Sequence, residues 1–234
     1  MLYLADWGEK KIMKRKECTD AVIFDMDGLM IDTERLAAGG WKKAGEEMGF
    51  PIDDCRISQI RGRNVAAIRQ LFLDWYGGEV SYEQARAIRV AYVEEEIRSK
   101  GVPVKAGLLE LLEYLKEETI LAAVASSTAR AVVEDYLSRV GVLSWFDTVV
   151  CGDEVQKCKP DPEIFLKAAE KLKADPKKCI VLEDSFNGIR AGYASGGKVI
   201  MVPNLDPPTE EAEKLCFRIC PTLAHVKKVL EEKI

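Results

Sequence analysis

The sequence predicts an α/β protein in which a doubly wound parallel sheet carries an inserted helical domain. Short apolar runs recur along the chain without polar–apolar alternation, which is typical of strands buried on both faces of a parallel sheet. Helix-like segments separate the last four runs, as the crossovers of a parallel sheet require. The first and second runs are about ninety residues apart, far more than one crossover helix needs.

Five apolar runs are expected to form the strands of this sheet. They are residues 21–25, 119–126, 147–152, 179–184 and 198–203. Helix start and stop signals lie between the later runs. Asp161 and Pro162 suit the beginning of one helix, and Gly141 suits the end of another.

The long gap predicts a discontinuous core, residues 1–32 and 104–234, with a helical domain over residues 33–103. Apolar residues within the gap recur at helical spacing, as one buried stripe shows: Ile68, Leu71, Phe72 and Trp75. Two glycines, Gly39 and Gly40, suggest that the first connection to this domain is bendable.

Composition excludes several functional classes. The chain of 234 residues has a formal net charge of −5, which gives no basic footprint for nucleic acid or an anionic membrane. No apolar run approaches the length of a membrane span. The seven cysteines form no CxxC pair, so we expect reduced thiols and a cytoplasmic location. The one histidine, His225, leaves acid–base chemistry to carboxylates. Residues 1–12 are expected to be dispensable, with Met13 as an alternative start.

Chemically active side chains follow the predicted strands. Asp25 ends the first and Asp27 comes just after it, Ser126 ends the second, Lys159 follows the third, and the Glu183–Asp184 pair ends the fourth. Because parallel strands end at one edge of a sheet, where open α/β sheets bind ligands, we expect these residues to meet.

Clustered carboxylates suit a hard cation, and Mg²⁺ typically takes one or two carboxylates together with waters and phosphate oxygens. A lysine and a hydroxyl beside them suit the remaining phosphoryl oxygens. Phosphoryl transfer depends mainly on positioning and charge neutralisation, and a carboxylate can serve as its nucleophile. Since free aspartate has a pKa of about 3.9, we expect Asp25 to ionise easily.

Four segments resemble the motifs of the haloacid dehalogenase superfamily. They are "DMDGLMIDTE", Ser126 in "AAVASST", Lys159 in "KCKPDPEIF", and "VLEDSFNGIRAG". They are similar to its phosphatase and phosphomutase branch, which has a Rossmann-like core and a helical cap between the first two motifs. The resemblance covers the chain from about residue 20 to the C-terminus.

This resemblance implies a role for each matching residue. Asp25 would be the nucleophile, and Asp27 the acid that protonates the leaving oxygen and later the base that activates water. Asp184, Asp25 and the backbone carbonyl of Asp27 would hold Mg²⁺, with Glu183 assisting directly or through water. The residues expected to bind the phosphoryl group are Ser126, Ser127, Lys159 and Gly28.

The implied activity is a phosphatase acting on a small phosphorylated metabolite, such as a sugar phosphate. A β-phosphoglucomutase-type phosphomutase is the alternative. Those mutases carry a histidine where this chain has Ala37 and an arginine near Val65, so both positions favour a phosphatase. Arg61 and Arg63 lie nearby, and we expect both to be solvated. A phospho-accepting signalling receiver is a third possibility, but it is half this length and lacks the insertion. No protein partner is indicated.

Overall fold

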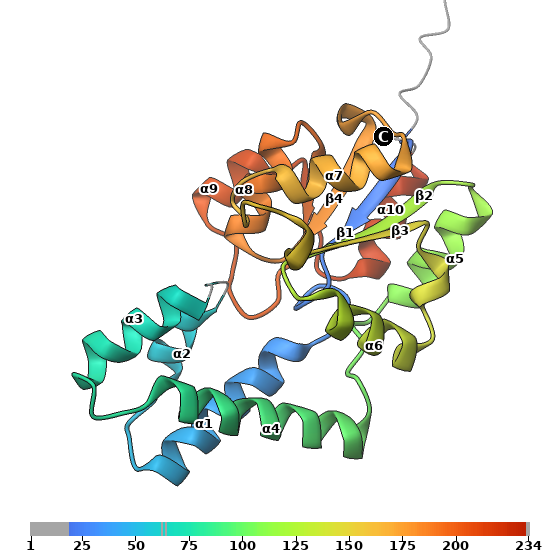
Figure 1. Ribbon diagram of the computed structural model, residues 1–234. Coiled ribbons are helices and arrows are strands. Elements are labelled where there is room, and N and C mark those ends of the chain that lie inside the picture. The colour runs from blue at the N-terminus through green and yellow to red at the C-terminus, as the bar shows by residue number, and fades with distance from the viewer. Residues whose placement is uncertain (1–18, 62, 64, 233–234) are drawn as a thin grey trace, which may run out of the picture.

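A six-stranded parallel sheet forms the centre of the computed structural model, which describes residues 19–61, 63 and 65–232 (Figure 1). The strand order is β3-β2-β1-β4-β5-β6. The five predicted strands are confirmed with slightly shorter bounds: β1 Ala21–Phe24, β2 Leu121–Ser126, β3 Thr148–Cys151, β4 Cys179–Glu183 and β5 Lys198–Met201. Strand β6 (Arg218–Ile219) was not predicted, because two residues are too few to make a pattern. The expectation about residues 1–12 concerns residues outside those described.

Helices cover both faces of the sheet, which confirms the doubly wound architecture. One face packs against α5 (Leu108–Glu117), α6 (Arg130–Val140) and α10 (Leu223–Glu231). The other packs against α7 (Glu163–Leu172), α8 (Phe186–Ala194) and α9 (Glu210–Leu215). Three short 3₁₀ helices complete the core: η1 Leu143–Trp145, η2 Gly152–Glu154 and η3 Pro176–Lys178.

The central strand explains why its apolar run shows no alternation. Val22 and Phe24 belong to the hydrophobic cluster on one face of the sheet, and Ala21 and Ile23 to the cluster on the other. All four are at most 1% exposed. Burying a side chain the size of Phe24 typically contributes about 1.5–3 kcal/mol, so β1 is anchored from both sides.

Four helices form the insert between β1 and α5, and Figure 1 places them beyond the carboxyl end of β1. They are α1 Thr33–Met48, α2 Asp54–Ile60, α3 Val65–Tyr76 and α4 Tyr82–Lys100. They have a hydrophobic cluster of their own, in which Phe72 is 1% exposed and touches the rings of Trp41 and Tyr82. None of the helices described is long and apolar enough to cross a lipid bilayer.

The glycine pair on the first connection was misinterpreted. Gly39 and Gly40 lie inside α1, where a Cβ would be 3.0 Å from the Tyr92 ring and 2.8 Å from Arg89 Cγ, respectively. These glycines therefore let α4 pack closely against α1, and the connection does not bend there.

The two connections between core and insert are tied to each other. The Asp32 N–H donates to the Pro103 carbonyl at 2.8 Å, and the Lys105 N–H donates to the Met30 carbonyl at 2.9 Å. Ile31 and Val104 form an antiparallel bridge between them. The chain thus leaves and re-enters the core at one point.

Candidate active site

Polar side chains gather where three neighbouring strands end. Asp25 directly follows β1, Ser126 is the last residue of β2, and Glu183 ends β4, with Asp184 after it. Each is less than a tenth exposed. Buried polar groups cost free energy unless they are hydrogen-bonded or paired, so their partners define this site.

Lys159 is the cation that pairs with these carboxylates. Its Nζ donates to Asp25 Oδ1 at 2.5 Å, to Glu183 Oε1 at 2.7 Å and to the Ala125 carbonyl at 3.0 Å. Nζ also lies 4.8 Å from the centre of the Phe165 ring. Burial alone would lower the pKa of Lys159, but the Asp25 and Glu183 carboxylates hold it above its usual value. The lysine therefore stays charged.

Glu183 is bound through both of its oxygens. Oε1 accepts from Lys159, and Oε2 accepts from the backbone N–H groups of Asp184 and Ser185, each at 2.9 Å, and from the Ser185 hydroxyl at 3.0 Å. A Cβ at Gly188 of α8 would lie 1.7 Å from Oε1, so only glycine fits there. Glu183 therefore fixes Lys159. Its predicted part in metal binding stays a prediction.

Asp25, Glu183 and Asp184 form a buried acidic cluster in which one oxygen of each lies within 4.8 Å of the others. Burial raises the pKa of Asp25 to about 8, Lys159 opposes the shift, and the charges of Glu183 and Asp27 add to it. Burial and the charges of Glu183 and Asp25 likewise raise the pKa of Asp184 well above its usual range. The expectation that Asp25 ionises easily is therefore wrong for the protein without a cation.

The acidic cluster fits a hard cation on its donor set. No described residue donates a hydrogen bond to the Asp184 carboxylate. In Asp25, Oδ1 accepts a hydrogen bond from Lys159, whereas Oδ2 accepts none from the described residues. Two buried carboxylates thus keep free oxygens, which are the ligands that Mg²⁺ prefers. Gly28 makes room for this arrangement, because a Cβ at its φ of +85° would lie 2.1 Å from Asp184 Oδ2. Its N–H donates to the Ile31 carbonyl at 2.8 Å, so its predicted phosphate contact stays a prediction.

Asp27 is held apart from the acidic cluster by hydroxyl groups. Thr33 at the start of α1 donates to Oδ1 at 2.6 Å, and Thr128 donates to Oδ2 at 2.7 Å. Ser126 makes a longer contact of 3.4 Å with Oδ2. Neither threonine was predicted, although Thr33 stands in the motif "DMDGLMIDTE" and Thr128 in the motif "AAVASST". These contacts orient the carboxyl group of Asp27.

The other predicted phosphate-binding serines differ in placement. Ser126 is fully buried, and its oxygen accepts from the Thr128 N–H at 3.0 Å. The Ser127 side chain is exposed. The backbone carbonyl oxygen of Ser127 packs against Gly152, where an added Cβ would lie only 2.1 Å from it. The roles of both serines in phosphate binding stay predictions.

Polar contacts join the helical insert to the loop after β5. Arg61, after α2, forms an ion pair with Asp206, and its side chain is 19% exposed. Asn204 donates to Glu34 Oε2 at 3.2 Å and accepts from Lys105 Nζ at 2.8 Å. Burial raises the pKa of Glu34, an effect that the charge of Arg61 opposes. The expectation that Arg61 is only solvated is therefore wrong.

The other insert positions of interest lie on α1 and at the start of α3. Ala37 is partly exposed on α1, and Val65, the first residue of α3, is 45% exposed. Arg63 is exposed, as expected.

A second group with metal-like spacing has a structural explanation. It consists of Cys151, Asp153 and Glu154. Glu154 already accepts from Lys171 at 2.8 Å and pairs with Arg130. Burial opposes ionisation, but these hydrogen bonds prevail and lower the pKa of Glu154 to about 2. The group is thus a neutralised ion network.

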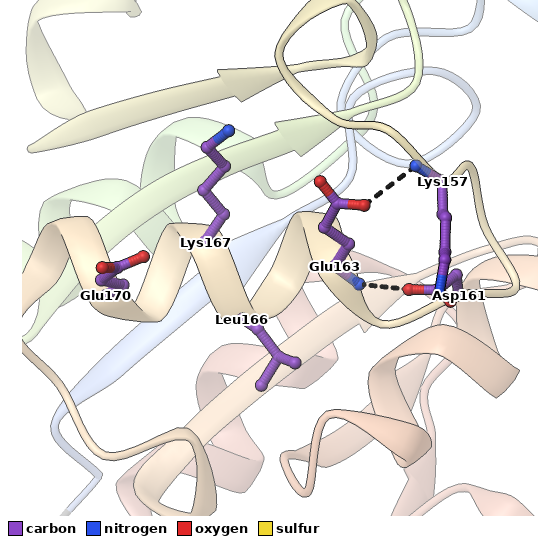
Figure 2. A pocket seen from close by; sticks show the side chains of 6 residues that line it. All are labelled: Lys157, Asp161, Glu163, Leu166, Lys167 and Glu170. Atoms are coloured by element: carbon purple, nitrogen blue, oxygen red, sulfur yellow. Dashed lines mark hydrogen bonds and ion pairs between the residues drawn. The ribbon is translucent and has the colours of Figure 1, made fainter.

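A surface hollow beside α7 is separate from this site. Figure 2 shows its lining side chains on α7 and the preceding loop: Lys157, Asp161, Glu163, Leu166, Lys167 and Glu170. Glu163 accepts from the Lys157 N–H at 2.9 Å, which fixes the loop that leads to Lys159. None of the strand-end residues lines the hollow.

Comparisons with known proteins agree with this geometry. The family model "Haloacid dehalogenase-like hydrolase" matches residues 22–202. The phosphorylated carbohydrates phosphatase of Thermotoga maritima is 33% identical over 177 residues, which are 76% of this chain and 82% of that protein. The β-phosphoglucomutase of Bacillus subtilis is 31% identical over 182 residues, 75% of this chain and 80% of that protein. The crystal structure of a HAD hydrolase from Entamoeba histolytica superposes with a TM-score of 0.74 at 26% identity, covering 87% of this chain and 93% of that one. The chain belongs to the haloacid dehalogenase-like hydrolases.

Proposed function

We propose that the protein is a Mg²⁺-dependent phosphatase that hydrolyses a small phosphorylated metabolite through a phosphorylated Asp25. The observation that carries the proposal is the contact of Lys159 with Asp25, inside an acidic cluster that also contains Asp184. A relative named as a phosphatase of phosphorylated carbohydrates supports a sugar phosphate or a similar monoester as the substrate. The six described cysteines are free thiols, which supports a cytoplasmic location.

In this proposal Asp25, Asp184 and the backbone carbonyl of Asp27 hold the cation. When bound, Mg²⁺ would neutralise charge on the phosphoryl oxygens and on the buried carboxylates. Lys159 supplies a second positive charge to the same oxygens. Glu183 acts mainly by holding Lys159 in place, because both of its oxygens already have protein donors.

In the first step an oxygen of Asp25 attacks phosphorus and the bond from phosphorus to the leaving oxygen breaks. Asp27 gives its proton to that oxygen, so the alcohol leaves neutral. In the second step Asp27 takes a proton from water as the water attacks phosphorus. The bond between phosphorus and Asp25 breaks, inorganic phosphate is released, and both aspartates return to their starting states.

A phosphomutase is the second candidate, because a β-phosphoglucomutase is among the relatives. Ala37 and Val65 favour the phosphatase, since neither side chain can donate a hydrogen bond to a sugar phosphate. A signalling receiver is the third candidate. It would hold phosphate on Asp25 without turnover.

The decisive experiment is a screen of phosphorylated metabolites with and without Mg²⁺, in which phosphate release and isomerisation are scored separately. We expect phosphate release that requires Mg²⁺ and disappears in Asp25→Asn. Activity that survives Asp25→Asn or a chelator would overturn the mechanism. Faster conversion of β-glucose 1-phosphate to glucose 6-phosphate than release of phosphate would identify a mutase. Long-lived phosphorylation without turnover would identify a receiver.

A further inference from the structure

An arginine of the insert has no acceptor for its buried guanidinium nitrogen. Arg89 lies on α4, and its Cζ lies 5.6 Å from the centre of the Trp41 ring. Its Nε is buried, and no acceptor for it lies within the part of the chain that the structure describes. Burying an N–H donor without an acceptor costs free energy, and Arg89 as a whole is only partly buried. An anion from outside the protein could therefore approach the rest of its guanidinium group.

Arg89 packs against α1, the same helix whose first residue, Thr33, contacts the proposed catalytic acid Asp27. A Cβ at Gly40 would lie 2.9 Å from the Arg89 carbonyl, so Arg89 packs beside α1 at the level of Gly40. Thr33, which donates to Asp27, lies seven residues earlier on the same face of α1, about 10 Å along the helix axis. Ala37 lies between them on that face and is partly exposed.

Electrostatic effects also connect Arg89 with Asp27. Burial and the charge of Arg86 lower the pKa of Arg89, whereas Tyr82, Tyr136 of α6 and the negative charge of Asp27 act in the opposite direction. Arg89 therefore lies within the electrostatic field of the catalytic acid, on the insert side of the site.

The geometry bears on the leaving group of the substrate. In the proposed reaction Asp27 protonates the leaving oxygen, so the leaving group lies on the side of Asp27, between it and the insert. We propose that Arg89 binds a second anionic group there, so that the preferred substrates are phosphate monoesters that also carry a carboxylate or another phosphate. This inference rests on the proposed phosphatase function. Charge-assisted hydrogen bonds from a guanidinium to such groups are among the strongest in proteins.

The test measures kcat/KM on pairs of esters that differ in the second anion. One pair is 3-phosphoglycerate and glycerol 1-phosphate, which tests a carboxylate. The other is fructose 1,6-bisphosphate and fructose 6-phosphate, which tests a second phosphate. We expect wild type to prefer the doubly anionic member of at least one pair by about 10- to 100-fold, as typical for a hydrogen bond to a charged group.

Variants of α4 connect that preference to Arg89. Arg89→Gln should abolish the preference by raising KM for the doubly anionic ester, and Arg89→Lys should keep most of it. Arg98→Gln is the matched control, because Arg98 is exposed near the end of α4 and pairs with Glu95. The same esters should bind Asp25→Asn about 10- to 100-fold more tightly than the double variant Asp25→Asn/Arg89→Gln.

Two results would overturn the inference. One is a wild type that treats both members of each pair alike, a result that does not depend on any variant folding. The other is an Arg89→Gln variant that lowers kcat/KM equally for both members. If phosphate is released without this discrimination, only the inference on Arg89 fails. If no ester is hydrolysed in the presence of Mg²⁺, the proposed function itself fails.

Discussion

Replacing Gly188 by alanine should destabilise the protein, against the usual trend for helices. Gly188 lies in α8 without a positive φ, where alanine would ordinarily stabilise by about 1 kcal/mol. Its added Cβ, however, would lie 1.7 Å from Glu183 Oε1 and 1.9 Å from Cδ. Non-bonded carbon and oxygen atoms need about 3.5 Å, so the carboxylate must move by roughly 2 Å.

That movement breaks at least two of the hydrogen bonds that Glu183 accepts from Lys159 and from the backbone N–H groups of Asp184 and Ser185. Losing two such bonds to a charged group costs about 3–6 kcal/mol. After the helix gain of about 1 kcal/mol, the free energy of unfolding should fall by about 2–5 kcal/mol. For a chain of this size the melting temperature should fall by roughly 5–20 °C.

Thermal unfolding followed by circular dichroism measures this loss, and a phosphatase assay at a temperature where the variant is folded measures the catalytic effect. Gly192→Ala is the matched control, because its Cβ would meet only valine side chains, at 2.9 Å from Val181 and 3.0 Å from Val199. It should lose stability but keep its turnover once folded. A Gly188→Ala protein as stable as wild type would refute the reasoning.

Three further predictions concern other contacts of the site. Thr33→Val should lower kcat about 10-fold with little change in KM, because Asp27 loses a hydrogen bond worth about 1.4 kcal/mol. Steady-state kinetics measures both constants, and an unchanged kcat would contradict the prediction. Since the pKa of Asp25 is raised to about 8, the cation must displace a proton at lower pH. Asp184, the other proposed carboxylate ligand, also has a raised pKa. Mg²⁺ affinity should therefore rise by at least about tenfold per pH unit below pH 8, with proton release detectable by calorimetry in two buffers; affinity independent of pH from 6 to 8 would refute it. Asp206→Asn removes the ion pair with Arg61, which is partly exposed, so the free energy of unfolding should fall by at most about 1 kcal/mol. Faster hydrogen exchange in α2 and α3 should accompany it, and a loss above about 3 kcal/mol would show that the pair is more than a surface contact.

The sequence predicted the sheet and the strand-end residues well, because both depend on local patterns. A strand buried on both faces must be apolar throughout, and parallel strands must end at the same edge. This logic placed Asp25, Ser126, Glu183 and Asp184 at one edge of the sheet before any contact was known.

Features that depend on distant contacts could not be predicted in the same way. Nothing local indicates that Arg61 meets a residue 145 positions away, or that Arg89 stacks on Trp41. The acidity of Asp25 was misjudged for the same reason, since its pKa depends on burial and on neighbours from three segments of the chain. The glycines of α1 looked like a bend because their close contacts with α4 do not appear in the sequence.

The paired connections at Asp32 and Pro103 also bear on how such a protein could arise and be rebuilt. Because the two connections are joined by a hydrogen bond of 2.8 Å, the whole insert can be exchanged without changing the path of any strand of the sheet. Joining these two points with a short turn should yield a minimal core that keeps its sheet. Grafting another helical module there would change what covers Asp25 while leaving the strand ends unchanged.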